Sequence, residues 1–111
     1  LEYWQGRCAI LGLDVPELLR ASHIKPWAEA TDEERLDVFN GLLLSPHLDA
    51  AFDRGFITIA EDGAVVVAPT LLPIARALLG LDRSLRLTGL RPQHQHYLGW
   101  HRMRFSARWT A

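Results

Sequence analysis

Short apolar runs, separated by glycine, proline and acidic residues, divide this chain into short strands and helices without an internal repeat. Glu61-Asp62-Gly63 is an Asp-Gly turn between two such runs and predicts a β-hairpin. A further short strand is expected at 85–87. The runs that we expect to be extended lie at 8–11, 22–24, 42–44, 56–59 and 64–68.

The clearest helix signal is Ser45-Pro46, because serine is a favoured N-cap and proline fits the first helical position. It predicts a helix from His47 to about Arg54 that ends at Gly55. Pro26 interrupts regular structure, so residues 27–38 are expected to be a loop with one helical turn. Further helices are expected at 15–19, with Asp14 as N-cap, at 71–79 and from Pro92 to about Trp109.

Composition is ordinary for one globular domain of 111 residues, with 49% hydrophobic and 23% charged residues. No apolar run approaches the ~18 residues of a membrane helix, and no secretory signal is present. Cys8 is the only cysteine, which excludes an internal disulfide and a cysteine-based zinc site. We expect Cys8 to be buried and the protein to be cytoplasmic. Because the chain begins at Leu1 without a methionine, we expect a piece of a longer protein.

Charge is divided unevenly, although the net charge is only −1. Residues 1–80 carry 6 basic and 12 acidic side chains, whereas residues 81–111 carry 6 arginines and one acid, Asp82. Such an asymmetry marks either a local surface for nucleic acid or a solvated helix face.

Reactive side chains concentrate between residues 21 and 53. On the helix after Ser45, Asp49 and Asp53 are four residues apart and share one face. Two carboxylates so placed repel weakly in water, and a bound cation reverses that repulsion. Oxygen ligands suit Mg²⁺, Mn²⁺ or Ca²⁺. The alternative is that Asp49 is solvated and Asp53 caps a nearby loop.

His23 and Asn40 have two interpretations each. His23 is either a general base, since imidazole titrates near neutral pH, or a half-buried histidine bonded to backbone. Asn40 either holds a neighbouring loop or orients His23 through its amide, or simply belongs to the Asn40-Gly41 turn.

The segments S-H-I-K-P-W at 22–27 and N-G-L-L-L-S-P-H-L-D-A-A-F-D-R-G at 40–55 together resemble the HNH endonuclease family, in the subgroup without zinc-knuckle cysteines. The resemblance spans residues 7–68. It implies an α+β fold, with a ββα-metal (HNH/His-Me finger) core at about 21–54. A supporting hairpin at 56–68 and helices at about 70–80 and 92–109 would follow, all within one nuclease domain.

By this resemblance, His23 activates water, Asn40 fixes the base and its loop, and one divalent metal, Mg²⁺ or Mn²⁺, is bound. Asp49 stands where the family has its last histidine ligand, and Asp53 follows one turn later. His47 is seven residues after Asn40 and points about 160° away from Asp49 on a helix from Pro46. With a later helix start, His47 would reach the metal or a phosphate.

Ser22 stands where many members of the family carry a metal ligand. Among the basic residues, we expect Arg54 to contact the scissile phosphate or pair with Asp37 or Glu61. The aromatic residues of the last helix, with Leu98 and Met103, are expected to form core. The further candidates for DNA contact are Lys25, Arg102, Arg104 and Arg108, with His94 and His101.

The sequence therefore predicts a metal-dependent DNA endonuclease, the cleavage module of a restriction-type protein whose target choice lies in another domain. A catalytically inactive HNH-like module that binds nucleic acid is the first alternative. A small interaction domain is the second. A homodimer would allow both DNA strands to be cut.

Overall fold

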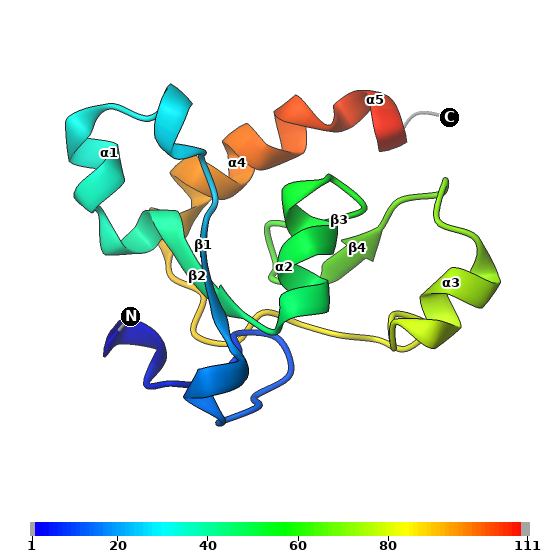
Figure 1. Cartoon of the computed structure of the whole chain (residues 1–111). Coiled ribbons are helices and arrows are strands. Elements are labelled where there is room, and N and C mark those ends of the chain that lie inside the picture. Colours follow the sequence, from blue (N-terminus) through cyan, green and yellow to red (C-terminus); the bar gives the residue numbers. More distant parts are fainter. Residues whose placement is uncertain (1, 110–111) are drawn as a thin grey trace.

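The structure of the chain is a computed structural model that describes residues 2–109, without the side chains of residues 107 and 108. Its longer elements are two antiparallel strand pairs and the helices packed beside them (Figure 1). The strands are β1 (Arg20–His23), β2 (Gly41–Leu44), β3 (Ile57–Ile59) and β4 (Val65–Val67). The α-helices are α1 (Asp32–Leu36), α2 (Pro46–Asp53), α3 (Pro73–Leu78), α4 (Gln95–Arg104) and α5 (Ser106–Trp109). Single 3₁₀ turns lie at Glu2–Trp4, Pro16–Leu18, Trp27–Glu29, Val38–Asn40 and Pro92–His94.

The centre of the fold is a ββα unit made of β1, β2 and α2. β1 pairs antiparallel with β2, so that His23 lies opposite Gly41 and Arg20 opposite Leu44. Ser45 then turns the chain into α2, which begins at Pro46 as predicted and contacts β1. In Figure 1 the two strands run side by side with α2 next to them. The predicted α+β fold with a ββα core is confirmed.

Burial explains why these segments adopt this arrangement. Every residue of β2 is buried, and α2 buries Leu48, Ala51 and Phe52 on its inner face. Fully burying a leucine or phenylalanine contributes about 1.5–3 kcal/mol. The same helical phase leaves Asp53 exposed and Asp49 partly exposed, because polar residues alternate with the apolar ones at the helical period.

The hairpin of β3 and β4 packs against α2 of this unit. All three residues of β3 are buried, and β3 contacts both α2 and α4. The predicted Asp-Gly turn is present, with Gly63 at a φ of +91° and the Asp62 carboxylate accepting from the backbone N–H of Ala64 at 3.0 Å. The hairpin prediction is confirmed.

The predicted strand at 8–11 is wrong, because this segment folds into a turn. Its buried residues are still tied to the core. The backbone N–H of Ala9 donates to the Leu43 carbonyl at 2.7 Å, and the Ala9 carbonyl accepts from Thr88 at 2.8 Å. Cys8 is buried, as expected. The expected strand at 85–87 is reduced to an isolated bridge between Ala64 and Arg86.

The last helix is interrupted rather than continuous to Trp109. It breaks at Phe105, between α4 and α5, where the Phe105 ring packs directly against Gly55. Leu98 is buried as expected. Met103 is not core, since 78% of its surface is exposed, and Trp100 is only partly buried.

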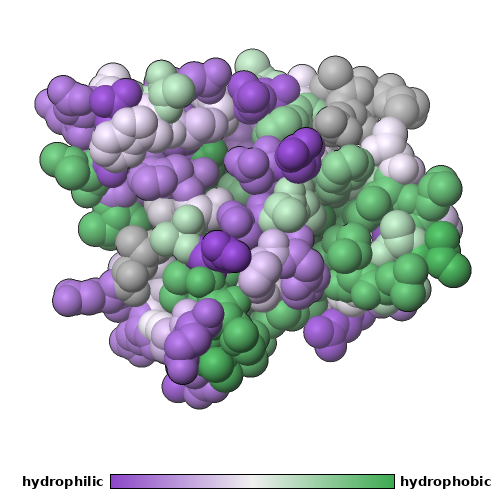
Figure 2. Space-filling model, in the orientation of Figure 1, coloured by the Kyte–Doolittle hydropathy of each residue, from purple (hydrophilic) through white to green (hydrophobic). Residues whose placement is uncertain are grey.

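α3 lies away from the ββα unit and presents an apolar face, seen as the green area on the right of Figure 2. Ile74 and Leu78 on α3, and Leu72 directly before it, are the exposed apolar residues here. Within residues 2–109, no helix combines the length and apolar character needed to cross a membrane.

Candidate active site

A hollow of about 200 Å³ opens where the end of β1, the end of α2 and α4 meet. His23, Asp53, Arg54 and Arg104 bring polar groups to it. Pro26, Phe52 and Phe105 are among the residues that form its walls. The hollow therefore combines an imidazole, a carboxylate and two guanidinium groups from segments that are far apart in sequence.

His23 is the last residue of β1 and its side chain is exposed. Its ring meets the Trp27 ring edge-to-face, with centroids 6.0 Å apart. Among the described residues, no group forms a hydrogen bond with either ring nitrogen of His23. The alternative of a half-buried histidine bonded to backbone is not what the structure shows, and both nitrogens are available to water.

Asn40 is completely buried, with 0% of its surface exposed, and its amide holds the loop that follows His23. Its Oδ1 accepts from the backbone N–H of Lys25 at 2.8 Å. Its Nδ2 donates to the carbonyls of Lys25 and Glu34, each at 3.2 Å. The backbone N–H of Ile24 also donates to the Asn40 carbonyl at 2.9 Å. The loop from His23 is thus fixed against the residue that precedes β2.

Glu34 is a second anchor of this loop, and sequence reasoning missed it. Its carboxylate accepts from the Lys25 ammonium at 3.0 Å and from the Thr31 backbone at 2.9 Å, and lies 2.9 Å from the His96 ring. The bond from Thr31, followed by those from His96 and Lys25, lowers the pKa of Glu34 to about 2. Thr31 and Glu34 form a capping box, and the Thr-x-x-Glu pattern is the signal that would have identified them.

Asp49 and Asp53 lie one turn apart on α2. Within the described part of the chain, neither carboxylate has a hydrogen-bond or ion-pair partner. Asp53 lines the hollow with His23. Residues 2–109 contain no cluster of three or more side chains of the types that ligate metals. Mg²⁺ fits such a sparse donor set, because it is commonly held by one or two carboxylates together with water and substrate phosphate.

His47 and Ser22 are placed less favourably for binding a metal ion than the two aspartates. α2 begins at Pro46, so the later helix start on which a role for His47 depended is not observed. The exposed His47 ring has its Nδ1 3.3 Å from the Ser45 hydroxyl. Ser22 is buried between its neighbours on β1.

The basic candidates separate into two groups. Arg54 and Arg104 line the hollow, and Arg54 forms none of the alternative ion pairs within residues 2–109. Lys25 is paired with Glu34. Arg102 lines a different surface hollow and donates to the Ile59 carbonyl at 2.6 Å. The side chain of Arg108 lies outside the described residues.

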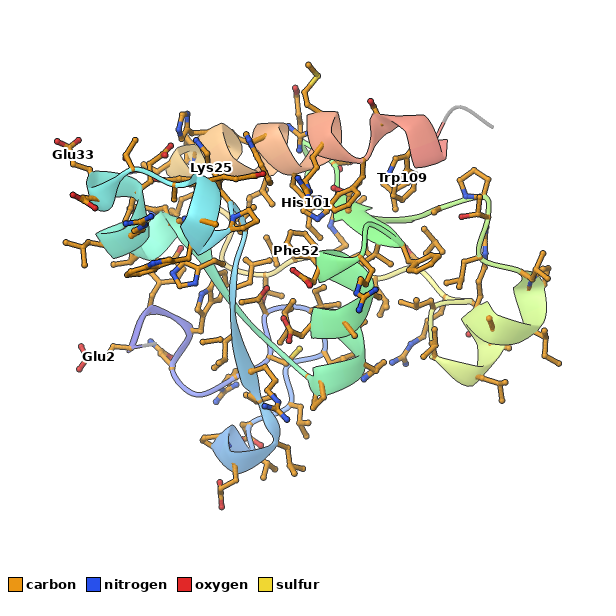
Figure 3. The ribbon with its side chains drawn as sticks, turned by 45° about the horizontal axis from the view of Figure 1, so that its top comes forward. Glu2, Lys25, Glu33, Phe52, His101 and Trp109 are labelled. Atoms are coloured by element: carbon orange, nitrogen blue, oxygen red, sulfur yellow. The ribbon has the colours of Figure 1, made fainter. Side chains whose placement is uncertain are left out.

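The expectation that His94 and His101 meet phosphates is wrong, because both are buried. His94 packs among the rings of Tyr3, Trp4 and Phe39, and burial lowers its pKa. His101 lies between α4 and α2, facing Phe52 (Figure 3). Burial lowers its pKa to about 4.

Comparison with known proteins agrees with this architecture. Residues 8–60 match the model of a family described as HNH endonuclease. A solved structure titled modification dependent TagI restriction endonuclease superposes with a TM-score of 0.58 at 25% identity. The alignment covers 93% of this chain and 34% of that chain, so this chain spans about a third of that protein. No curated protein matches the sequence.

Proposed function

Because residues 8–60 match the HNH endonuclease family, we propose that the chain is a nuclease domain that hydrolyses phosphodiester bonds of DNA with one divalent metal ion. The observation that carries the proposal is that His23 and Asp53 line one hollow together with Arg54 and Arg104. A nuclease needs a base, a metal ligand and cations for phosphate in one place. This hollow offers all three.

In this proposal, His23 removes a proton from the attacking water. Its exposed ring, with no hydrogen-bond partner in the described chain, is free to accept that proton. The water oxygen then bonds to phosphorus in line with the departing 3′ oxygen, so the product carries a 5′ phosphate. A positioned general base contributes about 10²–10⁴-fold to rate.

Asp53 and Asp49 would hold the metal ion, Mg²⁺ or Mn²⁺. When bound, the metal supplies positive charge that offsets the charge developing on the phosphate and on the leaving oxygen. Two carboxylates on one helix face suit such a cation, whereas His47 at the start of α2 points elsewhere by helical phase. We therefore assign ligation to the aspartates rather than to His47.

Asn40 and the arginines have supporting roles in the same proposal. Asn40 does not touch the hollow, and its three bonds to Lys25 and Glu34 make it a positioning residue for the loop after His23. Arg54 and Arg104 would contact the phosphate and its neighbour in the strand, since guanidinium groups bind phosphate oxygens directly. Arg102, on another surface, would contact the DNA backbone further away.

We also propose that the domain is the cleavage module of a restriction-type protein. The solved relative is itself a restriction endonuclease, and this chain corresponds to about a third of it. Recognition of the target would then belong to another domain. Two copies of the module would cut the two strands of a duplex.

The test is cleavage of supercoiled plasmid DNA in Mg²⁺ or Mn²⁺ by the wild type and by His23→Ala. We expect nicked or linear product from the wild type and a loss of at least about 10²-fold in the variant. Gln93→Ala, on the surface away from the hollow, is the matched control and should cleave as the wild type does. Absence of cleavage with either metal, together with retained DNA binding, would instead favour the inactive binding module, which the buried Ser22 at an expected ligand position also favours.

A further inference from the structure

A second hollow, of about 490 Å³, adjoins the candidate active site on the outer side of α4. Its walls are Lys25 and Glu29 on the loop after β1, and Trp100, Met103 and Arg104 on α4. Arg104 lines both hollows, so the two are neighbours on either side of this side chain. Figure 3 shows Lys25 beside α4.

The composition of the second hollow differs from that of a solvated helix face. Met103 has 78% of its surface exposed, although its sequence environment predicts core. Trp100 is only partly buried, and the Arg104 guanidinium lies 5.6 Å from the centroid of its ring. An aromatic ring, the guanidinium that lies over it and an exposed thioether thus share one hollow with the Lys25 ammonium.

These groups match the chemistry of a nucleotide. Nucleobases stack on aromatic rings and on arginine planes without a requirement for sequence. Arg104 carries a charge that suits a phosphate beside such a base, and Lys25, which is paired with Glu34, lies in the same hollow. We propose that this hollow binds an unpaired nucleotide next to the scissile phosphate, with its base on Trp100 and Met103. This inference rests on the proposed nuclease function.

Glu29 adds a regulatory feature to this subsite. Its carboxylate pairs with Arg104 at 3.4 Å, and both side chains are about half exposed. Ion pairs at such exposed positions are weak, so an incoming phosphate can replace Glu29 at Arg104. Glu29 consequently opposes binding of the strand, and its removal should strengthen binding rather than weaken it.

The subsite predicts that the enzyme favours DNA in which a base is already unpaired. In a perfect duplex, the base must first leave its stack, which costs free energy that a mismatch or a single strand does not require. A duplex with a mismatch beside the cleavage position should therefore bind more tightly than the matched duplex. A purely backbone-contacting nuclease would bind both equally.

The experiment measures binding of fluorescein-labelled oligonucleotides to the full chain carrying His23→Ala, with Ca²⁺ present, so that binding is separated from cleavage. The probes are a matched duplex, a mismatched duplex and a single strand. In this background, Trp100→Ala should weaken binding of the single strand about 10-fold, which is the usual effect of losing one stacked base. Trp100→Phe should restore most of the loss, and Glu29→Gln should tighten binding.

Met103→Ala keeps the inference testable if Trp100→Ala fails to fold. Leu78→Ala is its matched control, because Leu78 is equally exposed, at 82%, but lies on α3. We expect Met103→Ala to weaken binding of the single strand. Leu78→Ala should leave that binding unchanged. Equal binding by both variants, or equal binding of matched and mismatched duplexes, would overturn the subsite while leaving the nuclease proposal intact. Failure of every probe to bind, together with no plasmid cleavage, would instead overturn the nuclease proposal.

Discussion

The imidazole of His101 lies flat on the ring of Phe52, with centroids 3.8 Å apart and planes within 7°. Its Nε2 is 2.7 Å from the Phe52 carbonyl and its Nδ1 is 2.7 Å from the Thr58 hydroxyl. A carbonyl can only accept, so Nε2 carries the proton and Nδ1 accepts from Thr58. This one neutral side chain joins α4 to β3 and to the residue before Asp53.

The pH dependence of stability should contain a contribution from His101. Its pKa falls from an ordinary 6.5 to about 4 in the folded protein, because burial disfavours the cation. The unfolded chain therefore binds the extra proton first, and stability is lost as pH falls from 6.5 to 4, by about 3 kcal/mol. Urea unfolding at a series of pH values measures this slope.

In His101→Gln, the slope between pH 6.5 and 4 should become shallower, because glutamine has no proton to gain there. His94, whose pKa burial also lowers, keeps its own contribution in both proteins. Parallel profiles for wild type and variant across this range would contradict the assignment of the slope to His101.

Asn40→Ala should destabilise the protein by about 3 kcal/mol, because it removes three hydrogen bonds and leaves partly buried backbone groups of Lys25 and Glu34 without these partners. Gln93→Ala, an exposed amide, should change stability by less than about 0.5 kcal/mol. Denaturant unfolding compares them. A small effect of Asn40→Ala would mean that the loop after His23 is held by other contacts.

The choice of metal ligands can be tested by calorimetric titration with Mn²⁺. Asp53→Asn should weaken Mn²⁺ binding by more than about 10-fold. Changing a residue that only hydrogen-bonds to a metal ligand already costs about that much affinity, and Asp53 is proposed as a ligand itself. Asp49→Asn should also weaken it, because its carboxylate lies one turn away on the same face. His47→Ala is the control and should bind as the wild type does. If only His47→Ala lowered the affinity for Mn²⁺, the assignment of Asp49 and Asp53 as the metal ligands would be wrong.

Gly55→Ala should destabilise the protein by about 2–4 kcal/mol, for two separate reasons. Gly55 has a φ of +76°, which alanine adopts only with strain, and its added methyl would overlap the Phe105 ring. Gly80→Ala isolates the first reason, since Gly80 has a φ of +72° and no neighbour within 4 Å of an added methyl. Thermal unfolding of the two variants should therefore differ, and equal losses would show that Phe105 moves aside without cost.

Local sequence determined the elements whose signals lie within a few residues. Ser45-Pro46 and Gly55 define α2, and Asp62-Gly63 defines the hairpin turn, because capping and turn conformations depend on neighbouring residues alone. The four-residue spacing of Asp49 and Asp53 on this predicted helix likewise placed the two carboxylates on one face. The ββα core was predicted from the resemblance of residues 22–27 and 40–55 to the HNH endonuclease family, and a cytoplasmic location remains a prediction.

Only the tertiary structure decided which distant residues meet. The apolar run at 8–11 looks like a strand, yet Ala9 bonds to Leu43 and Thr88, because pairing partners outweigh local propensity. His101 and Met103 sit two residues apart on α4, and the sequence does not reveal that one is buried on Phe52 while the other is exposed. Burial depends on what the rest of the chain packs against each face of a helix, and that packing brings Arg104 beside His23 and Asp53.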